Sequence, residues 1–136
     1  MTLLSLLYVS RSTIAASVAE AAVLDIVATA HRRNPLLNLT GALIFTGSNF
    51  AQIFEGPTAS VDLMMGSIES DPRHKDIVVA DRLPALHRRF DEWSMAYSGR
   101  VRFVERHITA LFDPAAGMQK GEAAKQLRAL IYEFSL

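Results

Sequence analysis

Short apolar runs alternate with helically spaced apolar positions along the first part of the chain. Residues Leu3 to Ser10 form a short apolar run that predicts a buried strand. Segment 17–33 carries apolar side chains at helical spacing, which predicts an amphipathic helix. Ser17 and Glu20 have the spacing of a capping box and predict where this helix begins. Pro35 predicts its end, because the residue before a proline is pushed out of the helical region.

The same pattern continues with a hairpin, a second helix and two more strands. LTGALIFTGSNFAQIFEG reads as two strands joined by a turn at Thr46-Gly47-Ser48-Asn49. A helix is expected from about Thr58 to Asp71-Pro72, and strands are expected over Asp76–Leu83 and Glu92–Gly99. The order β-α-β-β-α-β-β predicts an α+β, ferredoxin-like sheet with both helices on one face.

Residues 101–136 are expected to form a pair of helices. One helix keeps Val104, Ile108 and Leu111 on one face, and the other keeps Ala124, Leu127, Ile131 and Phe134. The segment 113–117 separates them. We therefore expect a domain over residues 1–100 and a C-terminal helical extension over 101–136. The extension would cover the second face of the sheet, unless a partner subunit covers it, because a bare apolar face is an interaction surface.

Several polar side chains fall on strand faces that are otherwise apolar. Phe50, Gln52 and Phe54 share one face of their strand, because strand side chains alternate. A buried amide without a partner costs roughly 1–3 kcal/mol, so Gln52 needs a hydrogen bond. Tyr8, on the first strand, and Asn34, at the end of the first helix, are candidates for the same space. Each also has an ordinary interpretation as a core or helix-end residue.

Composition narrows the function classes. The chain has 136 residues with 14 Lys+Arg and 14 Asp+Glu, so its zero formal charge gives no case for nucleic acid or an anionic membrane. It has no cysteine, which excludes disulfides, thiol catalysis and cysteine metal sites. We expect a cytoplasmic protein, since the N-terminus has no leader pattern and no segment suits a membrane span. We find no motif of a common catalytic site, and the four histidines lack metal-ligand spacing.

A set of linked motifs resembles one known family. YVS, RRNPLLNLTGALIF, NFAQIFEG, IESDPRH and RRFDEWSMAYSG occur in the order found in BLUF domains, which are flavin-binding blue-light sensors. The resemblance covers about residues 2–100. It implies FAD held non-covalently between the two helices, with FAD rather than FMN coming from the family alone.

The resemblance also implies roles for particular residues. Tyr8 matches the electron-donating tyrosine, Gln52 the glutamine that bridges it to the flavin, and Asn34 an asparagine that binds the flavin ring. Trp93 and Met95 match the pair that relays the change on the last strand. The other implied cofactor contacts are Ile26, Arg33, Phe50 and Ile68, with Met95 counted among them. By the same resemblance, Ser67 stands where some relatives carry an arginine, so the contact of that arginine with the outer part of the cofactor is either missing or supplied by Arg32, Arg33 or Lys75.

The expected function is therefore that of a blue-light photoreceptor without an enzymatic output. About 35 residues after the sensor are too few for a catalytic domain. The signal would pass through the fifth strand and the C-terminal helices to a protein partner or a homo-oligomer. Two alternatives stay open on the same scaffold. One is an acylphosphatase-like hydrolase that uses Arg11 in the loop after the first strand, and the other is a flavin-free dimerisation module.

Overall fold

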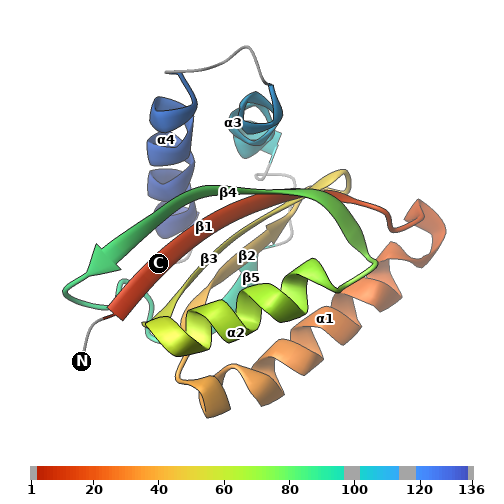
Figure 1. The fold of residues 1–136 in the computed structure, drawn as a ribbon. Coiled ribbons are helices and arrows are strands. Elements are labelled where there is room, and N and C mark those ends of the chain that lie inside the picture. Colours follow the sequence, from red (N-terminus) through yellow and green to blue (C-terminus); the bar gives the residue numbers. More distant parts are fainter. Residues whose placement is uncertain (1–2, 97–101, 114–118, 135–136) are drawn as a thin grey trace.

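The fold is built on a twisted five-stranded sheet (Figure 1). The computed structural model describes residues 3–96, 102–113 and 119–134. The strand order is β4-β1-β3-β2-β5, with β5 parallel to β2 and every other neighbouring pair antiparallel. The strands are β1 (Leu3–Ser12), β2 (Thr40–Phe45), β3 (Asn49–Pro57), β4 (His74–Ala85) and β5 (Trp93–Ala96).

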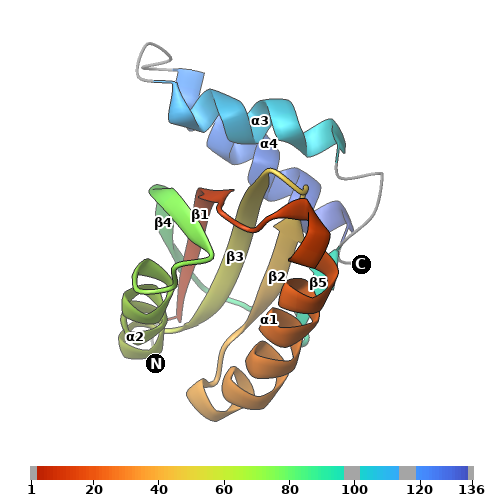
Figure 2. The same cartoon turned by 90° about the vertical axis from the view of Figure 1, so that its right-hand side faces the viewer.

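Helices cover both faces of this sheet. Helices α1 (Ala19–Arg33) and α2 (Thr58–Glu69) lie side by side on one face. Helices α3 (Arg102–Phe112) and α4 (Gln119–Phe134) pack together on the other face (Figure 2). The predicted α+β, ferredoxin-like fold is confirmed. The assignment of residues 101–136 as a separate extension stays a prediction.

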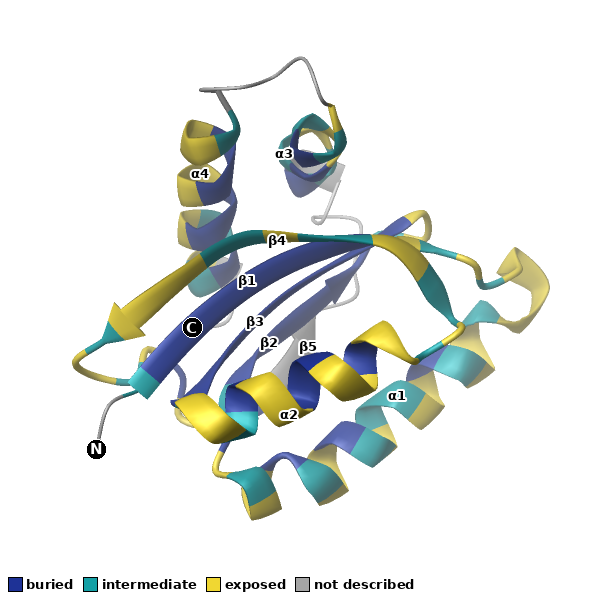
Figure 3. Ribbon diagram, in the orientation of Figure 1, coloured by how far each residue is buried: buried dark blue, intermediate teal, exposed yellow. Residues whose placement is uncertain are grey.

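Alternation along the strands divides the core into two layers, as the sequence predicts. Leu7, Val9 and Ile53 point to α3 and α4, where they pack with Ile108 and Leu127. Leu6, Tyr8 and Phe54 point to α2 on the opposite face, and Phe50 packs beneath α1. Figure 3 shows β1, β2 and β3 buried through most of their length, with exposed positions along β4 and on the outer sides of the helices. The C-terminal helices therefore cover the sheet face that the sequence left open.

The start of α1 differs from the predicted capping box. A 3-10 turn over Ala16–Val18 precedes the helix, which begins at Ala19 with Val18 as its N-cap and no side-chain cap bond. Ser17 lies inside that turn and is exposed, so its predicted pairing with Glu20 is wrong. The backbone of the turn takes over part of the capping, because Val18 N–H donates to Ala15 at 3.1 Å.

The end of α1 falls where it was predicted, for a different reason. The helix ends at Arg33, but Asn34 keeps helical angles (φ −62°, ψ −40°) in spite of the proline that follows. Pro35 opens a 3-10 turn over Pro35–Leu37, and the chain turns away at Asn38, which is left-handed with φ 58°. The amide N–H of Leu39 then donates to the carbonyl of Asn34 at 2.9 Å, which holds Asn34 against the start of β2.

Three other boundaries differ from the prediction. Strand β1 runs on to Ser12, so Arg11 pairs with Asn49 inside the ladder and does not lie in a loop. Strand β4 is longer than predicted at both ends, and its pairing with β1 shifts register twice. The predicted fifth strand begins one residue later, at Trp93, and its expected end near Gly99 lies outside the described residues.

Glycine is required at position 41, where the backbone of β2 lies close to that of its neighbour β3. Its φ is +154°, and a Cβ there would collide with the carbonyl oxygen of Ile53. The amide N–H of Gly41 donates to the carbonyl of Glu92 at 3.2 Å, just before β5. The absence of a side chain therefore lets β2 lie close to β3 while it holds the start of β5.

Candidate functional site

A buried phenol–amide pair lies at the centre of the face under α1 and α2. Tyr8 on β1 and Gln52 on β3 are direct partners across the antiparallel ladder. The Tyr8 hydroxyl donates to Oε1 of Gln52 at 2.7 Å, and the two residues are 3% and 7% exposed. This bond supplies the partner that the sequence required for a buried amide. With Oε1 accepting from Tyr8, the donor nitrogen of Gln52 is the opposite end of the amide.

A small cavity of about 50 Å³ opens beside this pair. Tyr8, Ile26, Phe50 and Ile68 all line it, so the structure brings together four of the residues that the sequence proposed as cofactor contacts. The remaining lining residues are Leu43, Asp71, Arg73 and His74. The walls come from α1 and from the end of α2, with the sheet as floor. An apolar slot with a few polar groups is typical of a small-molecule site.

The surroundings keep the Tyr8 phenol neutral. Burial raises the pKa of Tyr8 well above its ordinary value, and the nearby Asp71 carboxylate raises it further. The positive charge of Arg33 lowers the pKa by a smaller amount. The phenol therefore keeps its proton and acts as a hydrogen-bond donor at physiological pH.

Three residues of the DPRH motif organise the rim of the cavity. Arg73 forms an ion pair with Asp71 at 2.6 Å and with Asp25 of α1 at 3.0 Å, so it ties the end of α2 to α1. Partial burial raises the pKa of Asp71, but the hydrogen bonds and charge of Arg73 lower it by more in total. The motif is visible in the sequence, but the ion pairing of Arg73 was not predicted from it. An Asp and an Arg two positions apart beside a helix end are a signal for such a pairing.

His74 joins three elements next to Tyr8. Its Nε2 is 2.6 Å from the carbonyl of Ile68, which can only accept, so Nε2 carries a proton. In the neutral ring Nδ1 then accepts from the Ser10 hydroxyl at 2.7 Å. The ring also meets Tyr8 and Phe50 edge to face at 6.1 and 5.9 Å. These contacts agree with the structural role at the helix end that the sequence suggested.

A second cavity, of about 500 Å³, lies between the outer parts of α1 and α2. Arg33 and Leu37 line it on one side, and Met64 and Ser67 are among its residues on the other. Arg33 Nη1 donates to the Ser67 hydroxyl at 3.2 Å, so Arg33 reaches the position where some relatives carry an arginine. The Nε atom of Arg33 is buried without a hydrogen-bond partner among the described residues.

Asn34, which follows Arg33 in the chain, is buried with 2% of its surface exposed and is not among the residues that line the three described cavities. Its Oδ1 atom has no hydrogen-bond partner in the described part of the chain. An unpaired buried acceptor is costly, so a ligand with an N–H group would stabilise this arrangement. Arg33 and Asn34 thus offer polar groups of the kind that an added cofactor would satisfy.

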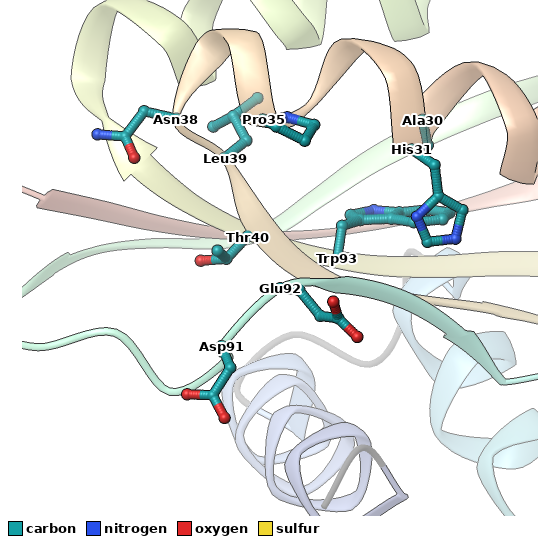
Figure 4. Close-up of a pocket in the computed structure, with 9 residues that line it drawn as sticks. All are labelled: Ala30, His31, Pro35, Asn38, Leu39, Thr40, Asp91, Glu92 and Trp93. Carbon is teal, nitrogen blue, oxygen red and sulfur yellow. The ribbon is translucent and has the colours of Figure 1, made fainter.

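Trp93 lies apart from the phenol–amide pair. It lines a separate cavity of about 330 Å³, formed with the end of α1 and the start of β2, and its ring meets that of His31 at 5.7 Å (Figure 4). Its Nε1 atom is buried without a partner among the described residues. Met95 pairs with Leu43, which pairs with Gln52, so position 95 lies in the same row across the sheet as the pair. The side chain of Met95 lies outside the described residues.

The fold and site together define an α+β sensor-type domain with a ligand cleft between two helices over a buried Tyr–Gln pair. The chain belongs to the BLUF family, described as sensors of blue light using FAD, whose sequence profile matches residues 3–96. It is thus a blue-light photoreceptor domain of the flavoprotein type.

Curated relatives share this domain within longer chains. The chain is 37% identical over 109 residues to the blue light- and temperature-regulated antirepressor BluF of Escherichia coli K12, covering 78% of this chain and 26% of that protein. It is 35% identical over 95 residues to the photoactivated adenylate cyclase subunit beta of Euglena longa, covering 69% of this chain and 11% of that protein. The chain therefore spans about a quarter and about a tenth of these relatives.

Solved structures match nearly the whole chain. The dark-state structure of BlrB, a BLUF protein, is 29% identical, with a TM-score of 0.73 and coverage of 97% of both chains. The photo-activated state of BlsA is 22% identical with a TM-score of 0.76, covers 96% of this chain and 94% of that one, and supports the fold alone. No helix in the described residues is both long and apolar enough for a membrane span.

Proposed function

We propose that this chain senses blue light by holding FAD between α1 and α2 and by rearranging the hydrogen bond between Tyr8 and Gln52. The observation that carries the proposal is this buried bond of 2.7 Å beside a cleft that α1 and α2 line. Membership of a family described as using FAD supports the cofactor.

The residues present fit such a cofactor. Ile26, Phe50 and Ile68 would contact the flavin ring, since they form the apolar lining of the cavity beside Tyr8. Asn34 would accept from a ring N–H through its unpaired Oδ1. Arg33 would face the phosphates of the cofactor, because a guanidinium matches phosphate geometry and its Nε is unpaired.

When bound, FAD would supply the absorption of blue light and an excited state that accepts an electron. Tyr8 keeps its proton at rest and directs it at Oε1 of Gln52, so a phenol that gave up an electron would share this proton with the amide and take it back when the electron returns. The amide of Gln52 can then rotate or change tautomer, which exchanges donor and acceptor with no change in volume. In a packed core this gives two discrete states.

The output we propose is a protein contact and not catalysis by this chain. The altered amide would act on Trp93 and Met95 of β5, with residues 101–136 as the receiving extension. The E. coli relative is named an antirepressor and the Euglena relatives are named adenylate cyclase subunits, so BLUF domains occur in proteins with different outputs. We propose a downstream protein or a homo-oligomer as the recipient here, acting in the cytoplasm without nucleic acid.

An absorption spectrum before and after blue light tests the proposal. The purified protein should be yellow, and its flavin band should shift to the red in light and return in the dark. A protein that cannot be reconstituted with FAD would refute it. The Gln52→Leu variant should keep FAD and lose the normal shift, so an unchanged shift in that variant would exclude Gln52 as the switch.

The two alternatives have less support from the structure. Arg11, the candidate phosphate ligand of a hydrolase, lies within β1 and pairs with Asp76 at 3.2 Å. Its guanidinium also lies over the Phe112 ring at 4.1 Å. Dimerisation through an open sheet face, the third hypothesis, conflicts with the cover that α3 and α4 provide in this structure.

A further inference from the structure

The loop between β4 and β5 is hydrogen-bonded to a buried carboxylate on β3. Glu55 is 1% exposed, and it accepts from the backbone N–H groups of Arg89 at 2.9 Å and Phe90 at 2.8 Å. Its third donor is the Thr40 hydroxyl at 3.0 Å. A carboxylate this deeply buried needs such a set of donors, so the loop cannot leave Glu55 without a large penalty.

Arg88 adds a second attachment of the same loop to the sheet. Its guanidinium donates to the Thr40 hydroxyl at 2.8 Å, to the backbone carbonyl of Glu55 at 3.0 Å and to that of Asn38 at 2.8 Å. Trp93 follows only three residues after Phe90, and the carbonyl of Glu92 accepts from Gly41 of β2. The position of the loop and the start of β5 are therefore set together.

On the side of the C-terminal helices, the same loop contacts Tyr132 of α4. The Phe90 ring contacts the Tyr132 ring at 5.3 Å, and the Arg89 guanidinium lies over Tyr132 at 4.2 Å. The Tyr132 hydroxyl accepts from Arg128 at 2.8 Å. Both Arg89 and Phe90 therefore contact Tyr132, and Phe90 also belongs to the apolar cluster that includes Leu127 and Ile131 of α4.

Arg128 links α4 to two strands of the sheet. It is 8% exposed, pairs with Asp81 of β4 and donates to the Ser5 hydroxyl of β1 at 2.5 Å. Burial lowers the pKa of Arg128, but the hydrogen bonds and charge interactions with Asp81 and Tyr132 together raise it by more, so the guanidinium stays charged. A charged group this well paired fixes the last turns of α4 on β1 and β4.

We propose that Tyr132 is the contact through which the loop before β5 acts on α4. The inference rests on the proposed function and deepens it, because it assigns the route by which a change at β5 reaches the C-terminal helices. Because Glu55 and Arg88 keep the loop from bending, a small shift at Trp93 changes how Arg89 and Phe90 contact the Tyr132 ring while their N–H bonds to Glu55 are kept. This route does not require the segment 97–101 that follows β5.

Hydrogen exchange of α4 in the FAD-loaded chain tests this route. Backbone exchange of residues 119–134 is measured by mass spectrometry in the dark and under continuous blue light, for the wild type and three variants. Tyr132→Leu removes the ring from Arg89 and Phe90. Tyr132→Phe keeps the ring and removes only the hydroxyl. Phe112→Leu removes the ring that Arg11 covers on α3 and serves as the matched control.

We expect light to change exchange in α4 of the wild type, of Tyr132→Phe and of Phe112→Leu, and we expect the change to be lost in Tyr132→Leu. The flavin shift should remain in all four proteins. A light-induced change that persists in Tyr132→Leu, or that is lost equally in Phe112→Leu, overturns the proposal. So does a wild-type α4 that does not respond while the flavin band shifts. A chain without any flavin shift instead refutes the proposed function itself, and the route with it.

Discussion

Removal of the Tyr8–Gln52 hydrogen bond should show a strong coupling between the two positions. Tyr8→Phe deletes only the donor and leaves Oε1 of Gln52 unpaired at a site where both residues are nearly fully buried. Gln52→Leu keeps the approximate volume and leaves the phenol unpaired. Each single change should cost about 1–3 kcal/mol of the free energy of unfolding, because an orphaned buried polar group bears its desolvation penalty.

The double variant should cost much less than the two single changes together. With both polar partners gone, the introduced phenylalanine and leucine side chains would pack against each other as apolar groups, and such a replacement is often close to neutral. From single costs of about 2 kcal/mol each and a double cost of at most about 1 kcal/mol, the coupling energy is about 3 kcal/mol or more in magnitude. With single costs of only about 1 kcal/mol each, it falls to about 1 kcal/mol.

Urea unfolding of the flavin-free proteins measures this cycle, because bound flavin would add its own contacts. Each kcal/mol should also lower Tm by roughly 3–5 °C in a chain of this size. Tyr132→Phe removes a hydroxyl that accepts from Arg128 on the opposite side of the sheet, so this variant should give no coupling with Gln52→Leu. Additive costs at Tyr8 and Gln52, within about 0.5 kcal/mol, would show that the bond in the structure does not contribute to stability.

Three further changes have defined outcomes. Arg33→Ala should weaken the binding of FAD and FMN by about tenfold, since one charged hydrogen bond is worth about 1.5 kcal/mol. Binding of riboflavin, which lacks phosphate, should stay nearly unchanged. An equal loss of affinity for all three ligands, measured by calorimetry, would contradict a phosphate contact. Glu55→Gln should lower the free energy of unfolding by about 2–3 kcal/mol, because the amide nitrogen that replaces one carboxylate oxygen cannot accept from the Arg89 N–H and the remaining neutral oxygen accepts more weakly from Arg89 and Phe90; a variant as stable as wild type in urea would contradict this role. Asp71→Asn should remove the contribution that the ionised carboxylate makes to the free energy of unfolding at pH values above its ordinary pKa of 3.8. The stabilities of wild type and variant should therefore converge as the pH falls through the lowered pKa of Asp71. A difference in stability that persists in acid would exclude the charge as its cause.

The sequence predicts the helices and strands whose apolar period is uninterrupted. It fails at helix ends, where backbone and side-chain groups compete for the same hydrogen bonds. The faces of β1 and β3 follow from alternation, and the hairpin register then brings Tyr8 opposite Gln52. The capping box at Ser17 fails because a 3-10 turn satisfies the backbone first. Asn34 lies at the end of α1 as expected, but the rule that a residue before proline leaves the helical region fails there, since Asn34 keeps helical angles and the left-handed Asn38 turns the chain instead.

Long-range partners set the rest of the site and are not visible in local spacing. Glu55 is recognisable as a polar residue on a buried strand, but its donors Arg89 and Phe90 lie more than thirty positions later. The pairing of Arg73 with Asp25 likewise joins two helices that are far apart in sequence. Such contacts depend on how β4 returns along β1, and the two register shifts in that pair are not encoded by any turn motif.

Strand β3 explains why this small domain can connect a ligand cleft to distant elements. A central strand that is buried on both faces is normally almost continuously apolar, yet β3 carries three buried polar side chains, Asn49, Gln52 and Glu55. Each bonds a different part of the molecule: Asn49 donates to Glu105 of α3 at 2.6 Å, Gln52 accepts from Tyr8, and Glu55 holds the loop before β5. Because every one of these groups would be costly to leave unpaired, we expect a change of partner at Gln52 to be transmitted through β3 rather than absorbed by it.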